Sequence, residues 1–206
     1  AQENATLFTV LLSFYYILLN KLTGLRDITV GTPVVARRHA DLQDIIGMFV
    51  NTLVLRNAPE ADLEWREFLA RVKSRVLEAY DNQEYPFEEL VEKVNIQRDP
   101  GRNPLFDTLF VLNYTSGEME TANVDVNAPD PEGEGQLNGQ TDIQPYEYEN
   151  LTSKFDLNFT YVELEGGIRF TVEYCTHLFK EETILRFIDY YQRIIRSVFL
   201  SKSKLT

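Results

Sequence analysis

The first strongly hydrophobic stretch of the chain runs from Thr6 to Leu22, and apolar residues lie on every side of its helical projection. Such a pattern predicts a helix that is buried all round. Gly24 follows, and glycine readily adopts the left-handed conformation that ends many helices. The uncharged part, 5–20, is too short and too polar for a membrane span and has no basic segment before it. We therefore expect a core helix and neither a membrane segment nor a signal peptide.

Two strands are predicted after this helix. The sequence DITVGTPVV, 27–35, has a strand pattern that we expect to be broken at Gly31 and Pro33. The sequence MFVNTLVLR, 48–56, carries apolar residues at successive positions. Apolar residues on both faces of a strand are typical of the interior of a sheet, so we place 48–56 there.

A third strand and a hairpin are predicted in the second half of the chain. LFDTLFVLNY, 105–114, is rich in β-branched and aromatic residues and follows a turn-rich connector. In KFDLNFTYVEL, 154–164, and IRFTVEYCT, 168–176, apolar and polar residues alternate. The intervening EGG is a turn signal, so these two segments are expected to form a hairpin.

Three further helices are indicated by apolar residues at spacings of three and four. We expect the first to begin at a cap on Asp62 and the second to cover 86–94, with Pro86 in its first turn. The third covers about 181–200. The residues expected to face the core are Leu69, Val72, Val76 and Tyr80 in the first helix and Leu185, Ile188, Ile195 and Val198 in the last.

Together these elements predict one α/β (α+β) unit over 1–206, with a mixed sheet flanked by helices. The chain has 206 residues, 44% of them hydrophobic, which suits a single packed domain. We find no internal repeat, and the tail 201–206 resembles the start of a linker.

The net charge of −12 is concentrated in one segment. Residues 115–150 contain nine acidic side chains and no Lys or Arg, which indicates a solvated acidic loop or insertion; its late part, 143–150, could add a short strand. Lys and Arg do not cluster elsewhere, so we do not expect a nucleic-acid partner. The single cysteine excludes an intramolecular disulfide and favours a reducing, cytoplasmic location.

Candidate catalysts are few. Cys175 and His177 lie two apart on a predicted strand and would face the same side, but no third orienting group is evident, and we expect a buried cysteine instead. His39 follows two arginines, which disfavour its protonated form, so we expect a loop or helix-cap role. Two histidines and one cysteine offer no metal-ligand spacing, and no metal site is expected.

Three segments carry a family resemblance. IGMFVNTLVLR, NQEYPFEEL and RDPGRNPLF, at 46–56, 82–90 and 98–106, resemble successive signature motifs of the condensation domains of nonribosomal peptide synthetases. The segments DITVGTPVVARRHADL and KFDLNFTYVEL resemble the same family. The resemblance therefore covers nearly the whole chain, with its motifs in the family's order.

The resemblance implies a two-lobed enzyme similar to chloramphenicol acetyltransferase, with the active site in a tunnel between the lobes. Two carrier domains bring thioester-bound substrates on phosphopantetheine arms, and the acceptor amine attacks the donor thioester to form an amide. The family's catalytic motif, HHxxxDG, belongs to the N-terminal lobe, and this chain has no two adjacent histidines. The chain therefore resembles the C-terminal lobe alone, without a catalytic residue or a bound cofactor of its own.

The resemblance places five residues at or near the tunnel: Arg37, Arg38, Gly47, Asn51 and Thr52. Glycine permits close passage of the backbone, and an Asn side chain can hold a substrate group. Asn51 could equally satisfy backbone groups at the end of its strand. The arginines could attract the phosphate of a pantetheine arm, or they could lie in a solvated loop.

The other motif residues are expected to be structural. Tyr85, Pro86 and Phe87 are interpreted as a helix start fixed by aromatic packing. The connector is expected to be held by an ion-pair cluster of Arg98, Asp99 and Arg102, next to the motif residues Asn103 and Pro104.

The partners that the resemblance implies are the N-terminal lobe, the donor and acceptor carrier domains and an adjoining adenylation domain. An isolated lobe would expose apolar surface, so we also expect self-association. Three alternatives stay open: a non-catalytic module that binds carrier proteins, part of a sibling epimerisation domain, and a coenzyme A-dependent acyltransferase of the same superfamily. The motif residues at 98–114 favour the condensing type over the epimerisation type.

Overall fold

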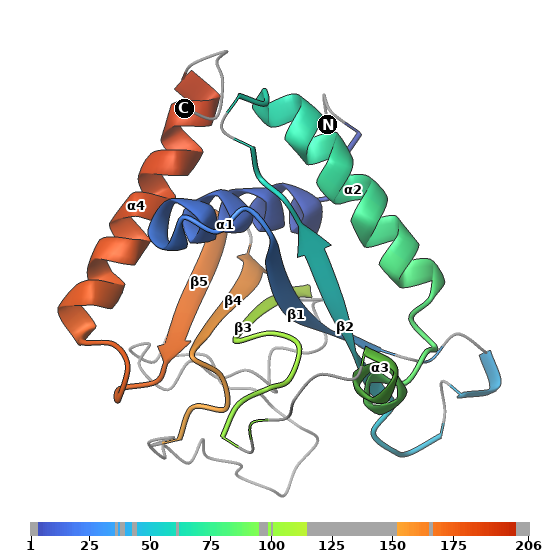
Figure 1. Ribbon diagram of the computed structural model, residues 1–206. Coiled ribbons are helices and arrows are strands. Elements are labelled where there is room, and N and C mark those ends of the chain that lie inside the picture. Colours follow the sequence, from blue (N-terminus) through green and yellow to red (C-terminus); the bar gives the residue numbers. More distant parts are fainter. Residues whose placement is uncertain are drawn as a thin grey trace, which may run out of the picture.

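Helices and strands alternate along the chain and form one mixed sheet with its covering helices (Figure 1). The computed structural model describes residues 4–114 and 152–200, apart from 36, 38–39, 43–44, 61, 95–98, 100 and 165–166. In chain order the elements are α1 Leu7–Thr23, β1 Ile28–Val35, the short 3-10 helix η1 Ala40–Leu42, β2 Val50–Asn57, α2 Trp65–Asp81, α3 Phe87–Val94, β3 Thr108–Tyr114, β4 Leu157–Leu164, β5 Gly167–Tyr174 and α4 Glu181–Leu200.

The sheet has the strand order β2-β1-β3-β4-β5. The pairs β1/β2 and β4/β5 are antiparallel, whereas β1/β3 and β3/β4 are parallel. Its two halves join where Gly31 of β1 pairs with Leu109 of β3. The predicted hairpin and mixed sheet are therefore confirmed.

Two strand predictions were wrong in detail. β1 is continuous through Gly31 and Pro33, and its ladder with β2 includes the pair Pro33↔Thr52. Proline is tolerated here because Pro33 lies beyond Gly31, the residue at which β1 pairs with β3. β2 is an edge strand and not an interior one. Of its apolar residues, Leu53 and Leu55 are buried, Val54 is half-buried and Val50, at the end nearest η1, is exposed.

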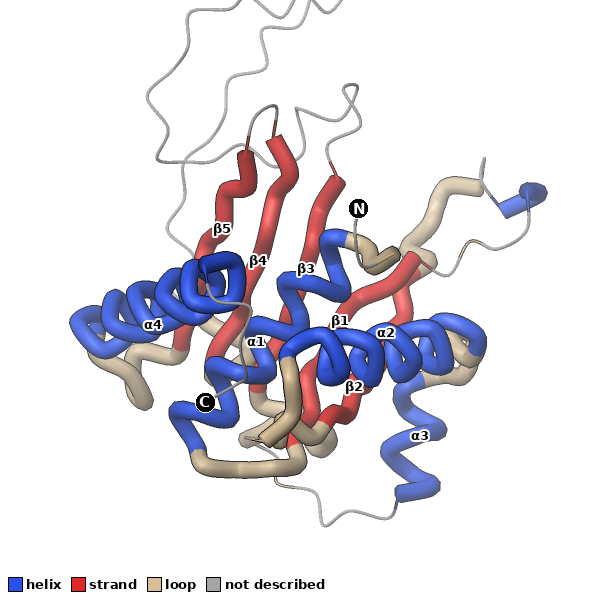
Figure 2. Tube along the Cα trace, turned by 90° about the horizontal axis from the view of Figure 1, so that it is seen from above, coloured by secondary structure: helices blue, strands red, loops and turns tan. Residues whose placement is uncertain are grey.

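The helices α1, α2 and α4 cover one face of the sheet, and α1 contacts both of the others (Figures 1 and 2). Alternate residues on this face are buried in β1 and β4 and half-buried in β5, as expected for a sheet with one covered face. Aromatic rings fill the layer between α1 and the central strands: Tyr15 lies 4.7 Å from Phe159 and Phe8 lies 5.4 Å from Phe110, measured between ring centroids. The core therefore lies between α1 and β3/β4.

Local capping explains α1. The Thr6 hydroxyl accepts a hydrogen bond from the Thr9 N–H at 3.2 Å, which satisfies one free donor of the first turn. At the other end Gly24 has a φ of 70°, and its N–H donates to the Asn20 carbonyl at 2.8 Å. The predicted helix, its end at Gly24 and its burial are confirmed.

The other predicted helices are present, with two corrections. The N-cap of α2 is Glu64, whose N–H donates to the Glu67 carboxylate at 3.4 Å, so the prediction of Asp62 was wrong. In α4, Leu185 is 57% exposed, and the buried residues are Ile184 and Tyr191. The tyrosine hydroxyl donates to the Leu11 carbonyl at 3.1 Å, which allows a polar tip to lie in the core.

Several predictions fall outside the described residues. These are the acidic segment at 115–150 with its possible strand at 143–150, the tail at 201–206, and the side chains of Arg38, His39 and Arg98. Among the described residues, no helix is both long and apolar enough to cross a membrane.

Candidate functional site

The three motif segments contact one another in the folded chain although up to 60 positions separate them in the sequence. Asn51 of the first segment binds the second, the second packs on the third through two phenylalanines, and the third forms an ion pair with the start of β4. We call this connected set the motif scaffold. It adjoins the sheet face opposite α1, α2 and α4.

Asn51 joins the start of β2 to the turn between α2 and α3. Its amide Nδ2 donates to the carbonyl oxygens of Gln83 and Tyr85, both at 2.8 Å, and its Oδ1 accepts from the Thr52 N–H at 2.9 Å. Both amide donors are thus used within the chain. Of the two roles predicted for Asn51, the contacts support the structural one.

We expect Asn51→Ala to lower the free energy of unfolding by about 1–3 kcal/mol, because two partly buried carbonyl groups lose their donors. Asn51→Asp should cost at least as much, since a carboxylate cannot donate to those carbonyls. Urea unfolding followed by Trp65 fluorescence measures the change. Asn82→Ala is the matched control: it removes an exposed amide that donates to the Glu78 carbonyl at 2.8 Å. Equal effects at both positions would contradict the linking role of Asn51.

Aromatic packing surrounds the start of α3, at the motif residues Tyr85, Pro86 and Phe87. The Phe87 ring meets the Phe106 ring edge-on at 5.8 Å between centroids, and the Pro86 carbonyl accepts the first helical hydrogen bond, from Leu90 at 3.1 Å. The Lys93 ammonium lies 5.1 Å from the centroid of the Tyr85 ring. The second motif therefore anchors α3 against the third.

Phe106 is the centre of this packing. It is buried, stacks on Phe155 at 5.5 Å between centroids, and covers Gly31 so closely that a Cβ added there would lie 2.3 Å from the ring. Gly31 is needed for this close approach. The last residue of the third motif thus rests on the junction between the two halves of the sheet.

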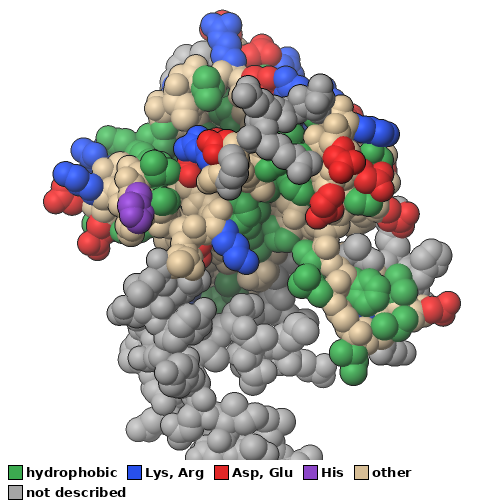
Figure 3. Space-filling model, turned by 60° about the horizontal axis from the view of Figure 1, so that its bottom comes forward, with side chains coloured by type: hydrophobic (Ala, Val, Ile, Leu, Met, Phe, Trp, Pro, Cys, Tyr) green, Lys and Arg blue, Asp and Glu red, His purple; other side chains and the backbone are tan. Residues whose placement is uncertain are grey.

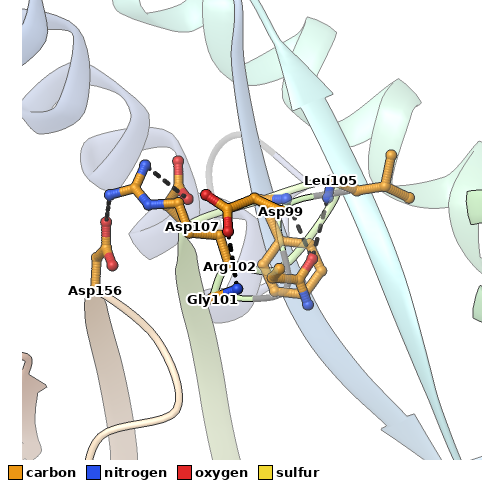
Figure 4. A network of polar contacts seen from close by, with 8 residues as sticks. Asp99, Gly101, Arg102, Leu105, Asp107 and Asp156 are labelled. Carbon is orange, nitrogen blue, oxygen red and sulfur yellow. Dashed lines mark hydrogen bonds and ion pairs between the residues drawn. The ribbon is translucent and has the colours of Figure 1, made fainter. Parts of the chain in front are cut away.

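An ion-pair network holds the connector, but its members differ from those predicted (Figure 4). The Arg102 guanidinium lies between two carboxylates, 2.9 Å from Asp156 and 3.6 Å from Asp107. Asp99 instead accepts from the Gly101 N–H at 2.9 Å and bends the backbone. The predicted cluster of Arg98, Asp99 and Arg102 was therefore wrong for Asp99 and Arg102, because the carboxylates that pair with Arg102 lie just before β3 and β4.

Asn103 and Asp156 complete the geometry of the connector. Asn103 Oδ1 accepts from the N–H groups of Leu105 and Phe106 at 3.1 and 3.4 Å, a short turn that leads into Pro104 and β3. Burial raises the pKa of Asp156, while the nearby Arg102 opposes that change. Exposed pairs of this kind contribute about 0–1 kcal/mol, so the network defines geometry more than stability.

Arg37 and Gly47 lie together in the segment between β1 and β2. The Arg37 guanidinium donates to the Ile45 and Gly47 carbonyls at 2.8 and 2.9 Å and lies over the Phe49 ring at 4.4 Å. The nearest side chain to a Cβ on Gly47 would be Phe49 at 3.2 Å. The contacts of both residues thus help to define the conformation of this segment.

The described residues contain no assembled catalytic group. β5 ends at Tyr174, so Cys175 and His177 lie in the following turn, and their predicted placement on one strand was wrong. The Cys175 carbonyl accepts from the Leu178 and Phe179 N–H groups at 3.0 Å, which turns the chain toward α4. In the part of the chain that the structure describes, no three His, Cys, Asp or Glu side chains are grouped to hold a metal ion.

Four residues of the motif scaffold were not predicted from the sequence: Gly31, Asp107, Asp156 and Phe155. The two aspartates each follow a phenylalanine and precede a buried strand, in FDTL and FDLN. Paired FD dipeptides before two adjacent parallel strands place their carboxylates at the same end of the sheet. This signal could have identified the partners of Arg102.

The family model of the condensation domain matches residues 1–204. This chain belongs to the condensation domain family. Condensation domain relatives occur in long synthetases: the chain is 41% identical over 201 residues to gramicidin S synthase 2 of Aneurinibacillus migulanus and 44% identical over 200 residues to tyrocidine synthase 2 of Brevibacillus parabrevis. These matches cover 98% and 96% of this condensation domain chain but only 4% and 5% of the two synthetases.

Solved structures confirm the fold of this condensation domain chain. It superposes on a four-domain nonribosomal peptide synthetase bound to AMP and glycine with a TM-score of 0.82, at 23% identity, over 97% of this chain and 15% of that one. For the condensation domain of monacolin K polyketide synthase the TM-score is 0.76 at 19% identity, over 100% of this chain and 44% of that one. The predicted chloramphenicol acetyltransferase-like mixed sheet flanked by helices is therefore confirmed.

Proposed function

We propose that this chain is the C-terminal half of an amide-forming condensation domain and forms one wall of its substrate tunnel. The observation that carries the proposal is coverage: the chain aligns over its full length with the monacolin condensation domain but accounts for 44% of it. The X-domain of teicoplanin biosynthesis gives the same share, 44%, with a TM-score of 0.80. The sequence supports this, because it has the three motif segments that resemble the family and has no HHxxxDG.

The wall in this proposal is the sheet face opposite the three covering helices. Strand alternation places Leu109 and Val111 of β3 and Asn158 and Thr160 of β4 on this face, and all four are half-buried. Asn158 Oδ1 is a buried acceptor that has no hydrogen-bond partner among the described residues. Such a face offers an apolar surface with a few polar groups, as substrate sites do.

The reaction proposed for the assembled domain joins two carrier-bound substrates. The acceptor amine nitrogen attacks the donor thioester carbonyl, the new C–N bond forms and the C–S bond breaks. The amine proton leaves and the released thiol is protonated, so no oxidant is needed. Phosphopantetheine belongs to the carrier domains in this scheme. In this scheme Arg37 and Asn51 shape the wall, since their side chains donate to backbone carbonyls within the chain. A contact from Arg38 to a pantetheine phosphate stays a prediction.

Reconstitution tests this function. The chain is mixed with the segment that precedes the matched region in tyrocidine synthase 2, and two loaded carrier domains are added. We expect no amide product from either half alone and amide product, detected by mass spectrometry, from the mixture. Changing the second histidine of HHxxxDG to alanine in the added half should abolish product.

Two outcomes would reject the proposal. Product from the 206-residue chain alone would mean that it carries its own catalyst. Association of the two halves with active carriers but without product would favour the alternative of a non-catalytic carrier-binding module, which stays open because the chain has no catalytic motif.

A further inference from the structure

Arg37 is the centre of a compact set of contacts between β1 and β2. Its guanidinium donates to three backbone carbonyls, those of Leu42, Ile45 and Gly47, with the last two at 2.8 and 2.9 Å. Its planar carbon also lies 4.4 Å from the centroid of the Phe49 ring. Arginine suits this role because its donors form a rigid fork and its flat face stacks on aromatic rings. We call these contacts the Arg37 clamp.

The clamp holds a segment whose apolar side chains face away from the core. This apolar loop, Ile45–Val50, includes Ile46 with 100% and Met48 with 91% of its surface exposed. It lies next to η1, which stands away from the body of the molecule in Figure 2, and hydrophobic side chains gather on the projecting segment at the lower right of Figure 3. Exposed apolar groups in a fixed loop are typical of a surface that binds a partner.

The apolar loop contains no charged residue, since its sequence is IIGMFV. A partner that covered it would not have to remove water from any charged side chain, so the contact surface would be apolar. The other part of a condensation domain is large enough to be this partner. The chain corresponds to 44% of a solved domain, so more than half of that domain is available to cover the loop.

We propose that Arg37 is a positioning residue that preorganises the apolar loop for docking on the other half of the condensation domain. This inference rests on the proposed function. Fixing a loop before binding removes the entropic cost of ordering it in the complex. The charge of Arg37 is thereby used to bind backbone carbonyls within the chain and not a ligand.

Loop order can be measured directly with a nitroxide spin label at Ile46→Cys in a Cys175→Ser background. We expect slow label motion in the parent and fast motion in Arg37→Gln. Arg37→Lys should also give fast motion, because an ammonium keeps the charge but cannot match the fork of three carbonyl contacts. Arg26→Gln, an exposed arginine at the other end of β1, is the control and should leave the label slow. Circular dichroism and Trp65 emission verify that each variant is folded.

Docking is then measured with unlabelled protein, by titrating the segment that precedes the matched region in tyrocidine synthase 2. We expect Arg37→Gln and Arg37→Lys to bind about 10- to 100-fold more weakly, from the cost of ordering a few side chains on binding. Arg26→Gln should bind like the parent.

The outcomes separate the two proposals. Equal label motion in the parent and Arg37→Gln, or equal affinity with that segment, overturns the positioning role while leaving the proposed function intact. Restored affinity in Arg37→Lys also overturns it, because charge alone would then suffice. A parent chain that does not bind the segment at all overturns both proposals.

Discussion

Replacing Phe159 with alanine is expected to lower the free energy of unfolding by about 3–5 kcal/mol, the range for loss of a large core aromatic. Phe159 is 0% exposed and lies in the centre of the aromatic layer. Its ring centroid lies 4.7 Å from that of Tyr15 in α1 and 5.8 Å from that of Tyr191 in α4. The truncation would leave a cavity at the point where both helices meet β4.

The change can be read by urea unfolding with Trp65 fluorescence, since Trp65 is the single tryptophan and stacks on Phe14 of α1 at 5.3 Å. Phe199→Ala is the control, because Phe199 is 71% exposed at the end of α4. A total stability of about 5–15 kcal/mol is usual for a domain, so the Phe159 variant should be close to unfolding. A loss below about 1 kcal/mol would show that the aromatic layer is not the core.

The elements with local signals could be predicted from the sequence. α1 has a threonine before it and a glycine after it, and both make the expected capping hydrogen bonds. The hairpin of β4 and β5 follows from alternation over neighbouring segments. These features depend on residues a few positions apart, so periodicity and capping chemistry are enough to predict them.

The errors have non-local causes. β2 contains as many apolar residues as an interior strand, but its position at the edge depends on which strand pairs with β1. In α4 the buried face contains Tyr191, whose hydroxyl finds a carbonyl in α1, 180 positions away. A prediction from apolar residues alone therefore placed Leu185 toward the core, whereas Leu185 faces solvent.

The sequence predicted which segments form the candidate site, but it did not predict which of their residues contact one another. The motif segments do assemble, but the partners of Arg102 and Phe106 come from 54 and 49 positions later in the chain, at Asp156 and Phe155. Ion pairs and ring contacts over such distances are determined by the parallel alignment of β3 and β4. Spacing within the motif segments could not identify them, and the available signal was the pair of FD dipeptides before β3 and β4.

Gly31→Ala is expected to be the most damaging small substitution, with a loss of about 1–3 kcal/mol from overpacking. The added Cβ would lie 2.3–2.6 Å from three atoms of the Phe106 ring. That ring has little room to move, because Phe87 and Phe155 pack against it at 5.8 and 5.5 Å between centroids. The strain would act where β1 pairs with β3.

A double-mutant cycle identifies the cause of this loss. Phe106→Leu removes the ring atoms that the new Cβ would meet, so Gly31→Ala should cost less in that background, with a coupling of about 0.5–3 kcal/mol by urea unfolding. Gly167→Ala is the matched control, because a Cβ at Gly167 would meet nothing within 4 Å. Additive losses at positions 31 and 106 would contradict the steric cause. Coupled losses would show that the third motif holds the two halves of the sheet together, since Phe106 belongs to that motif and packs against Gly31 of β1.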